Sequence, residues 1–224
     1  MSTVPILLEW RGQRLWISPE RCMFWEEQSI LILSDLHIGK TAHFRKAGIA
    51  VPQQLFQEDM HRLYQQIHYF NPNRILITGD LFHSHANIEH EVFARWRETL
   101  GDREIMLVRG NHDKLDDAVY TEMGIQCVGM EWAIEDFVFT HEMPEAVDAS
   151  KYYFTGHQHP GIKLIGKGKQ SLVLPCFYFR SNHVVLPAFS TFSGKHIIEV
   201  KKNEFAYGII DHAPVKSLVL FPTS

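Results

Sequence analysis

Carboxylate, imidazole and amide side chains gather at five points along the chain, and at each point they follow directly after an apolar run. In chain order the clusters are Asp35-x-His37, Gly79-Asp80, Gly110-Asn111-His112-Asp113, His141, and Gly156-His157-Gln158-His159. A single Asp-x-His pair is common in surface loops, but five clusters in the same position after a strand-like run predict a metal site. Mixed oxygen and imidazole donors suit manganese, iron or zinc better than calcium.

This ordered donor set resembles that of the metallophosphoesterases, and the resemblance implies hydrolysis of a phosphate ester. The reaction needs hydroxide at neutral pH and an offset for the negative charge of the phosphate. Two divalent cations about 3.5–4 Å apart supply both, because they lower the pKa of a bound water from 15.7 toward about 7 and also hold phosphoryl oxygens. The carboxylates of Asp35 and Asp80 cancel only part of the charge of two such cations. The site therefore stays positive and attracts phosphate.

Strands and helices that alternate along the chain must position these residues. The alternation predicts parallel pairing through right-handed crossovers, in an α/β sheet covered on both sides. The carboxyl ends of parallel strands share one edge, so the polar clusters are expected to meet there. The expected strands are 30–33, 74–78 and 104–108, and the expected helices begin at Pro52, follow a cap at Asn87, and span Lys114–Met123.

The regions on either side of this alternation are expected to be antiparallel. Short strands are predicted in an edge meander before residue 28, at 6–10, 14–17 and 22–25. After residue 135 the strand-like segments are 136–140, 152–155, 171–174, 176–179, 183–186, 196–200 and 205–209, which predict a second, mainly antiparallel sheet. Residues 1–224 are expected to form a single domain, because the sequence has no repeat, low-complexity segment or obvious linker.

Composition narrows the class of protein. Hydrophobic residues make up 45% of the 224 residues, and no run approaches the roughly 20 apolar residues of a membrane helix. The first residues lack the features of a secretory signal, so we expect a cytoplasmic protein. Cys22, Cys127 and Cys176 are too far apart for a Cys-x-x-Cys pair, which argues against a disulfide framework and against a structural zinc protein.

Charge is unevenly distributed along the chain. The net charge is -4, but residues 161–202 carry +6 and the remainder carries -10. Two interpretations stay open for this basic segment: it contacts a polyanion, or its lysines are solvated on hairpin turns.

The ordered set of motifs over residues 30–160 resembles the calcineurin-like metallophosphoesterase superfamily. The resemblance implies a four-layer αββα sandwich, with parallel βαβ units N-terminal and antiparallel strands C-terminal. It implies a first metal held by Asp35, His37 and His159, and a second held by Asn111, His141 and His157, with Asp80 bridging the two.

The resemblance further implies that His112 protonates the leaving group or binds the phosphate, and that Asp113 holds the His112 imidazole in the right tautomer. Gly79, Gly110 and Gly156 are expected to let the backbone turn sharply off each strand.

The second motif departs from the superfamily pattern at one position. Many relatives have Gly-Asp-x-x-Asp, whereas this chain has His83 at the last position. That Asp is generally a supporting residue, so the dinuclear site itself is not in doubt. His83 either supports Asp80, His37 or the substrate, or it belongs to the loop that enters the next helix.

The flanking segments suggest a narrower family. After the first motif, Lys40, His43 and Arg45 either bind a phosphate beyond the scissile one or lie in a solvated loop. The motifs His159-Pro-Gly161, Leu174-Pro-Cys-Phe177 and Leu186-Pro-Ala-Phe189 resemble the ligase-associated DNA damage response endonuclease family, called PdeM. This resemblance implies a bacterial, manganese-dependent phosphodiesterase or nuclease that uses a metal-activated hydroxide and is linked to a DNA ligase and a helicase in repair.

Other functions remain open on the sequence. One alternative is a phosphoesterase of the same superfamily that acts on a nucleotide, a lipid-linked pyrophosphate or a phosphoprotein; the lipid substrate is disfavoured because no long apolar insertion is present. Another alternative is a non-catalytic scaffold. Such scaffolds usually lose metal ligands or the histidine of the third motif, and here Asn111 and His112 are both present.

Overall fold

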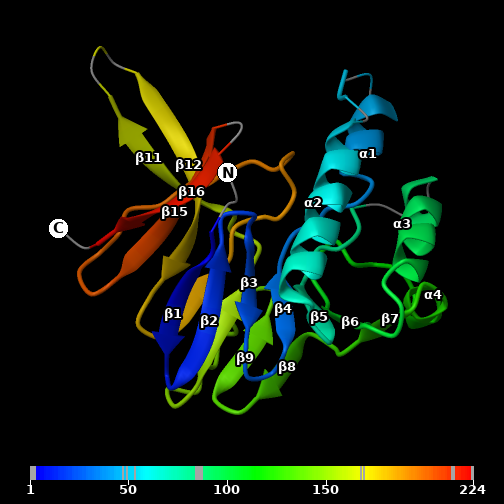
Figure 1. Cartoon of the computed structure of the whole chain (residues 1–224), viewed down its shortest axis with the longest axis horizontal. Coiled ribbons are helices and arrows are strands. Elements are labelled where there is room, and N and C mark those ends of the chain that lie inside the picture. The colour runs from blue at the N-terminus through cyan, green and yellow to red at the C-terminus, as the bar shows by residue number, and fades with distance from the viewer. Residues whose placement is uncertain are drawn as a thin grey trace.

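Two β-sheets pack face to face, and the helices cover the outer face of the first sheet (Figure 1). The structure is a computed structural model that describes residues 4–46, 48, 50–52, 54–83, 88–166, 168, 170–212 and 215–222. No helix of these residues is long and apolar enough to cross a membrane.

The first sheet has seven strands in chain order. Its antiparallel part joins β1 to β4, and its parallel part joins β4 to β7. The strands are β1 (Ile6–Trp10), β2 (Gln13–Ser18), β3 (Cys22–Trp25), β4 (Ile30–Leu33), β5 (Arg74–Thr78), β6 (Glu104–Val108) and β7 (Ile125–Cys127). The predicted strands β3 to β6 are confirmed at the expected residues, because continuous apolar runs of this length suit strands buried on both faces.

The second sheet has nine strands in the order β14-β11-β12-β13-β10-β9-β8, with β15 paired to β12 and β16. Three pairs are parallel, namely β9–β10, β10–β13 and β11–β14, and the others are antiparallel. The strands are β8 (Glu131–Ile134), β9 (Phe137–Thr140), β10 (Tyr152–Thr155), β11 (Pro160–Ile165), β12 (Ser171–Phe179), β13 (His183–Val185), β14 (His196–Ile197), β15 (Phe205–His212) and β16 (Val215–Phe221).

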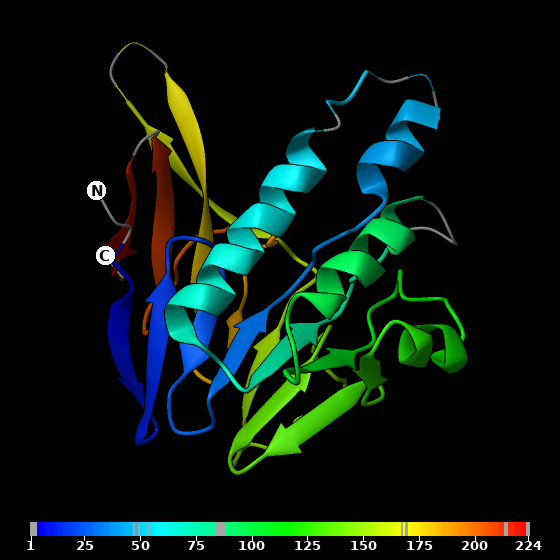
Figure 2. The ribbon, with the colours of Figure 1, turned by 45° about the vertical axis from the view of Figure 1, so that its right-hand side comes forward.

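The helices of the described residues are α1 (Lys40–Lys46), α2 (Gln54–Phe70), α3 (Ile88–Glu98) and α4 (Asp117–Glu122). Helices α2, α3 and α4 lie over one face of the first sheet, and α1 lies beyond the carboxyl ends of its strands (Figure 2). Helix α1 was not expected from the sequence. Helix α4 is shorter than the predicted 114–123, since Asp116 is still extended at φ -67° and ψ 149°. The predicted cap at Asn87 lies outside the described residues.

The hydrophobic core has two main layers. One layer packs the helices on the first sheet, with Leu31, Ile75 and Leu107 turned toward them. The other lies between the sheets, where Trp25 and Ile32 meet the inner side chains of β9, β10 and β12. The N-terminal strands therefore close the space between the sheets, and they are more than an edge meander.

The expected fold class is confirmed, as an α/β protein with two mixed sheets, parallel strands N-terminal and antiparallel strands C-terminal. One layer differs from the expectation. Among the described residues no helix follows Glu122, so the outer face of the second sheet has no helical layer there. A small cluster of Ile162, Cys176 and Tyr178 covers part of this face, with Ile198 and Val200 of an irregular segment packed against it.

His183 is expected to lower the free energy of unfolding as the pH becomes acidic. Its ring is buried at 5% exposure on β13. Burial, reinforced by the charge of Arg180, lowers the pKa of His183 from 6.5 to about 4. The unfolded chain binds this proton below about pH 6.5 and the folded chain does not, so the stabilisation is present above pH 6.5 and is lost as pH falls toward 4.

We expect the free energy of unfolding to fall by about 2 kcal/mol between pH 7 and pH 5 because of this group. Urea unfolding of metal-free protein at the two pH values measures the change. His183→Gln should lose this part of the pH dependence, while His61→Gln, at an exposed position of α2, should keep it. The same pH dependence in wild type and His183→Gln would contradict the prediction.

Candidate metal centre

The polar clusters meet where β4, β5, β6, β9 and β10 end, at the edge shared by the two sheets. Two groups of side chains could each hold a metal ion, and within each group the ligand atoms lie within 4.8 Å of one another. The first group is Asp35, His37 and His159, and the second is Asp80, His141 and His157. The structure thus brings together residues up to 124 positions apart in the sequence.

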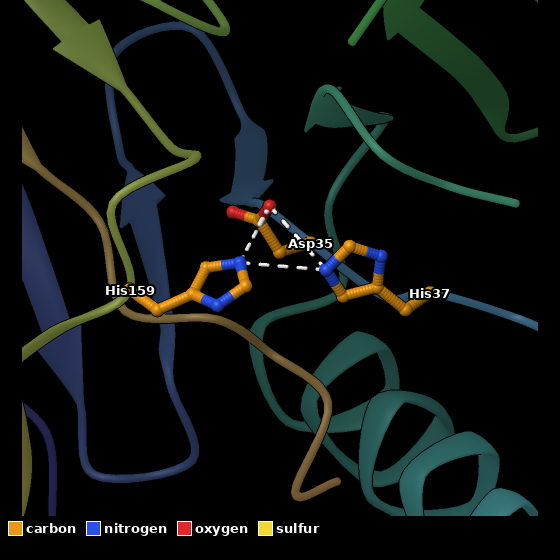
Figure 3. A group of neighbouring side chains, drawn as sticks. All are labelled: Asp35, His37 and His159. Carbon is orange, nitrogen blue, oxygen red and sulfur yellow. Dashed lines mark hydrogen bonds and ion pairs between the residues drawn. The ribbon is translucent and has the colours of Figure 1, made fainter. Parts of the chain in front are cut away.

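In the first group, one oxygen of Asp35 faces both imidazoles (Figure 3). Asp35 Oδ1 lies 3.0 Å from His159 Nε2 and 3.8 Å from His37 Nε2, and the two Nε2 atoms are 3.4 Å apart. The other oxygen, Oδ2, accepts hydrogen bonds from the Ser34 hydroxyl at 2.6 Å and from the backbone N–H of His157 at 3.1 Å. Asp35 is fully buried, so this arrangement holds its free oxygen toward the histidines.

In the second group, Asp80 faces both sets of ligands. Its Oδ2 lies 3.4 Å from His141 Nε2 and 4.0 Å from His37 Nδ1, while Oδ1 accepts a hydrogen bond from the backbone N–H of His112 at 2.9 Å. Asp80 therefore lies between the two groups. Asn111 joins the same group, because its Oδ1 lies 3.2 Å from His157 Nδ1.

His141 provides the test of whether these residues fit a metal. Its Nδ1 lies 2.9 Å from the carbonyl of Thr78 and donates to it, so Nε2 is the atom that faces the site. Nε2 is buried without a hydrogen-bond partner among the described residues, and it lies 3.9 Å from Asp35 Oδ1 as well as near Asp80. A lone pair directed at two carboxylates is repulsive unless a proton or a metal cation lies between them. The site therefore fits a divalent cation, which would replace that proton.

Electrostatics keep the carboxylates ionised and one imidazole neutral. Burial alone raises the pKa of Asp35 and Asp80, but the hydrogen bonds and charges of the neighbouring histidines outweigh it, and the pKa of Asp80 lies at about 2. Burial, with the charge of Lys40, lowers the pKa of His37 to about 3. Burial also lowers the pKa of His141, yet the nearby carboxylates of Asp80 and Asp35 outweigh it and raise the pKa to about 9.

Backbone strain is concentrated in the ligands themselves. Five of them adopt a left-handed conformation that non-glycine residues rarely use: Asp35 (φ 57°), His37 (φ 50°), Asp80 (φ 53°), His157 (φ 63°) and His159 (φ 47°). Each such residue costs on the order of 1–3 kcal/mol and persists only where the surroundings enforce it. The sequence indicated sharp turns here but attributed them to the glycines, and no local signal marks the ligands as the strained residues.

The motif glycines have two different roles. Gly79 has φ 84°, so the expected sharp turn is confirmed there. Gly110 and Gly156 are not left-handed, and glycine is required there for close approach. A Cβ on Gly156 would lie 1.8 Å from Ser34 Oγ and 2.6 Å from Asp35 Oδ2, and one on Gly110 would lie 2.2 Å from Asp80 Oδ1.

Gly156→Ala should weaken metal binding about 10- to 100-fold, because the new methyl group displaces the Ser34–Asp35 pair that orients the ligand oxygen. Metal titration of the stripped protein measures the affinity. The double variant Ser34→Gly/Gly156→Ala removes the closest contact and should recover part of the loss. Gly166→Ala is the matched control, since its nearest neighbours lie at 3.8 Å. Wild-type affinity in Gly156→Ala would refute this role.

Asp113 does not occupy the position expected for it. Its buried carboxylate accepts hydrogen bonds from the backbone N–H groups of Asp80 (2.7 Å), Gly110 (2.9 Å), Leu81 (3.0 Å) and Phe82 (3.2 Å). Among the described hydrogen bonds of Asp113 none reaches the His112 imidazole, because the turn directs the side chain back under the second motif. Burial raises the pKa of Asp113 to about 6. We correct its role to that of a clamp between the second and third motifs.

His112 and His83 lie together at the open side of the centre. The His112 side chain is 39% exposed, and its Nε2 lies 4.0 Å from Asp80 Oδ2. The His83 ring lies 4.8 Å from the His112 ring and 5.7 Å from the His37 ring, measured between centroids. Of the two interpretations of His83, these distances favour a role at the site over a role only in the loop that enters the next helix.

Of the other expected substrate-binding residues, the structure describes the side chains of Lys40 and Arg45. Lys40 begins α1, and its backbone N–H donates to the carbonyl of His37 at 3.0 Å. Burial lowers the pKa of Lys40, while the charges of Asp35 and Asp80 act in the opposite direction, so its ammonium lies within their field. Arg45 is half-buried on α1, and the side chain of His43 lies outside the described part of the structure.

Three further groups hold the ligands in place. The Ser34 hydroxyl supports Asp35, Glu142 Oε1 lies 3.5 Å from His157 Nδ1, and the carbonyl of Gly194 lies 3.3 Å from His159 Nδ1. Ser34 and Glu142 each adjoin a motif, so their position in the sequence is a usable signal. Gly194 has no such signal, because a backbone carbonyl carries no residue-type information.

Comparisons with known proteins agree with this geometry. The sequence profile described as calcineurin-like phosphoesterase matches residues 28–160. Among solved structures, the chain is similar to the nuclease MPE of Pseudomonas putida, with 26% identity, a TM-score of 0.77, and coverage of 91% of this chain and 96% of that one. A weaker similarity is to YfcE, a phosphoesterase from E. coli, with 14% identity, a TM-score of 0.44, and coverage of 80% and 91%. A comparison with curated proteins finds none that matches.

Proposed function

The chain belongs to the calcineurin-like phosphoesterase family, and we propose that it is a dinuclear-metal phosphodiesterase that cleaves nucleic acid strands. The observation that carries this proposal is the convergence of two ligand groups on Asp80, whose Oδ2 faces His141 of one group and His37 of the other. The similarity to a Pseudomonas putida nuclease over 91% of the chain supports nucleic acid as the substrate.

We assign each ligand to one of two metal ions. Asp35, His37 and His159 would hold the first ion, Asn111, His141 and His157 would hold the second, and Asp80 would bridge both. When bound, the ions supply Lewis acidity, a lowered water pKa and positive charge against the phosphate. The hydrogen bonds of Ser34 and Thr78 fix how Asp35 and His141 present their ligand atoms.

His112 is the residue that we assign to proton transfer. Its exposed imidazole, beside Asp80, is open to a substrate phosphate and its leaving group. An imidazole donates a proton near neutral pH more readily than other side chains. Substrate contacts are assigned to Lys40, Arg45, His43 and His83.

Manganese is the metal we propose, with iron and zinc as the alternatives, because the donors are oxygen and imidazole. A role in bacterial DNA repair beside a ligase and a helicase, in the cytoplasm, rests only on the resemblance of the flanking motifs to the PdeM family. A single domain is supported by the core between the sheets, to which residues from Leu15 to Ile209 contribute.

An activity assay tests the proposal. Purified protein is stripped of metal, reloaded with manganese, iron or zinc, and assayed on bis(p-nitrophenyl) phosphate, p-nitrophenyl phosphate, a mononucleotide, and single- and double-stranded DNA. We expect turnover of the diester and of DNA, fastest with manganese, and none with Asp35→Asn, which controls for a contaminating nuclease. No turnover of any substrate would refute the proposal that the protein is an enzyme. Turnover of the monoesters alone would indicate that its substrates are small phosphorylated molecules.

A further inference from the structure

Arg21 is a buried cation that no carboxylate neutralises directly. It is 8% exposed in the turn between β2 and β3. Its Nη1 donates to the carbonyl of Ser190 at 2.9 Å and approaches that of Ala188 at 3.5 Å. No carboxylate oxygen among the described residues lies within 4.0 Å of its guanidinium, whereas its neighbour Arg62 pairs with Asp59 at 2.8 Å. Asp59, Asp211 and Glu20 act on this guanidinium only from beyond ion-pair distance. A buried charge without a directly paired counter-ion is costly, so the guanidinium is suited to receive an anion.

Arg21 opens into a crevice beside the first metal group. The crevice is lined by Arg21, Lys195, Ser190, Ser193 and Gly194, and also by the metal ligand His159. His159 is anchored to this wall, since its Nδ1 lies 3.3 Å from the Gly194 carbonyl. The lining therefore connects the arginine to the site of hydrolysis.

The chemistry of the lining selects for an oxyanion. The Ser193 hydroxyl oxygen is buried and has no hydrogen-bond partner among the described residues. Lys195 lines the same crevice, and partial burial of its ammonium together with the charge of Arg21 lowers the pKa of Lys195. Two cations and an unpaired hydroxyl thus line the same narrow crevice.

We propose that this crevice binds the phosphate that neighbours the scissile one on a nucleic acid strand, with Arg21 and Lys195 contacting its oxygens. The inference rests on the proposed phosphodiesterase function and adds a specificity determinant to it. A diester with a single phosphate lacks this contact, so the enzyme should favour substrates that carry a second phosphate one nucleotide away.

Matched dinucleotides test the crevice. The manganese-loaded enzyme is assayed on thymidylyl-thymidine without a terminal phosphate, with a 5′-phosphate, and with a 3′-phosphate, and on bis(p-nitrophenyl) phosphate. We expect one phosphorylated form to have a kcat/KM at least about tenfold higher than the unphosphorylated form, a gain typical of a charge-assisted contact. Lys195→Met and Arg21→Met should reduce this preference to within about twofold, with turnover of the nitrophenyl diester retained.

Control variants separate binding from folding. Lys163→Met removes an exposed lysine of β11 that does not line the crevice, and it should keep the full preference. Arg21 also fastens the backbone at Ser190, so the Tm and metal content of Arg21→Met are measured. Lys195→Met carries the test if Arg21→Met unfolds, because Lys195 is exposed.

Turnover and substrate preference distinguish an error in the crevice assignment from an error in the proposed function. No turnover of bis(p-nitrophenyl) phosphate, the dinucleotides or DNA by wild type would refute the function itself. Turnover of that diester without any preference among the dinucleotides, or a preference that Lys195→Met retains, would overturn the crevice alone. Binding gives a second readout: with the His112→Ala background and a labelled oligothymidylate, Lys195→Met should reduce the slope of log K against log salt by about 0.7. An unchanged slope would likewise count against the crevice.

Discussion

Asp80→Asn should destroy the two-metal centre while leaving the fold intact. Asp80 Oδ2 is the oxygen that faces both ligand groups, at 3.4 Å from His141 Nε2 and 4.0 Å from His37 Nδ1. Asparagine has the same shape and can still accept the hydrogen bond from the His112 N–H with its oxygen. Its amide group then faces His141, where it donates to Nε2 instead of binding a cation. The charge that would hold both ions is also lost.

We expect metal content to fall from two ions per chain to one or none, and the phosphodiesterase rate to fall by about three orders of magnitude or more, since the ions supply both water activation and charge. Elemental analysis after dialysis, with circular dichroism to verify folding, measures the first effect. Asp136→Asn, at an exposed carboxylate outside the site, is the matched control. Two tightly bound ions per chain in Asp80→Asn would disprove the bridging assignment.

His112→Ala should separate catalysis from metal binding. The His112 imidazole belongs to neither metal group, and its 39% exposure leaves it open to substrate. The backbone N–H of His112, which holds Asp80 Oδ1, is unaffected by the substitution. We therefore expect two ions per chain and a kcat lower by about 10²–10⁴-fold, the usual contribution of a positioned general acid.

The leaving group decides between the two roles open to His112. Nitrophenolate leaves readily without a proton, whereas a nucleoside alkoxide does not. A loss much larger on DNA than on bis(p-nitrophenyl) phosphate would identify proton donation, and equal losses would identify phosphate binding. His61→Ala, an exposed histidine of α2, controls for general effects of removing an imidazole. Loss of metal from His112→Ala would contradict both roles.

For Asp113 the sequence indicated a functional residue but not the groups that its side chain contacts. Adjacency in sequence suggested that Asp113 orients the His112 ring, but neighbouring side chains in a tight turn point in different directions. The carboxylate accepts four backbone hydrogen bonds instead. A change at Asp113 is therefore expected to disturb the second motif first, and His112 only indirectly.

The sequence by itself determined the strands that carry the centre and the edge at which its ligands meet. Apolar runs such as Ile30–Leu33 have a local cause, burial on both faces, and parallel pairing places the ends of β4, β5 and β6 together. The identity of the ligands follows from chemistry that depends on residue type. For these reasons Asp35 and Asp80 could be predicted as candidate ligands from the sequence, and the structure places each of them in a group that could hold a metal.

Only the tertiary structure decided the conformation of the ligands and the surroundings of the centre. The left-handed backbone at Asp35 and His159 is imposed by contacts between segments far apart in the chain, so no local pattern encodes it. Two further features were also decided only by the tertiary structure: the outer face of the second sheet has no helical layer among the described residues, and Arg21 lies beside the centre. Arg21 lies beside His159 because the packing of the two sheets brings the turn after β2 against residues 188–195, and that packing is not a property of either segment alone.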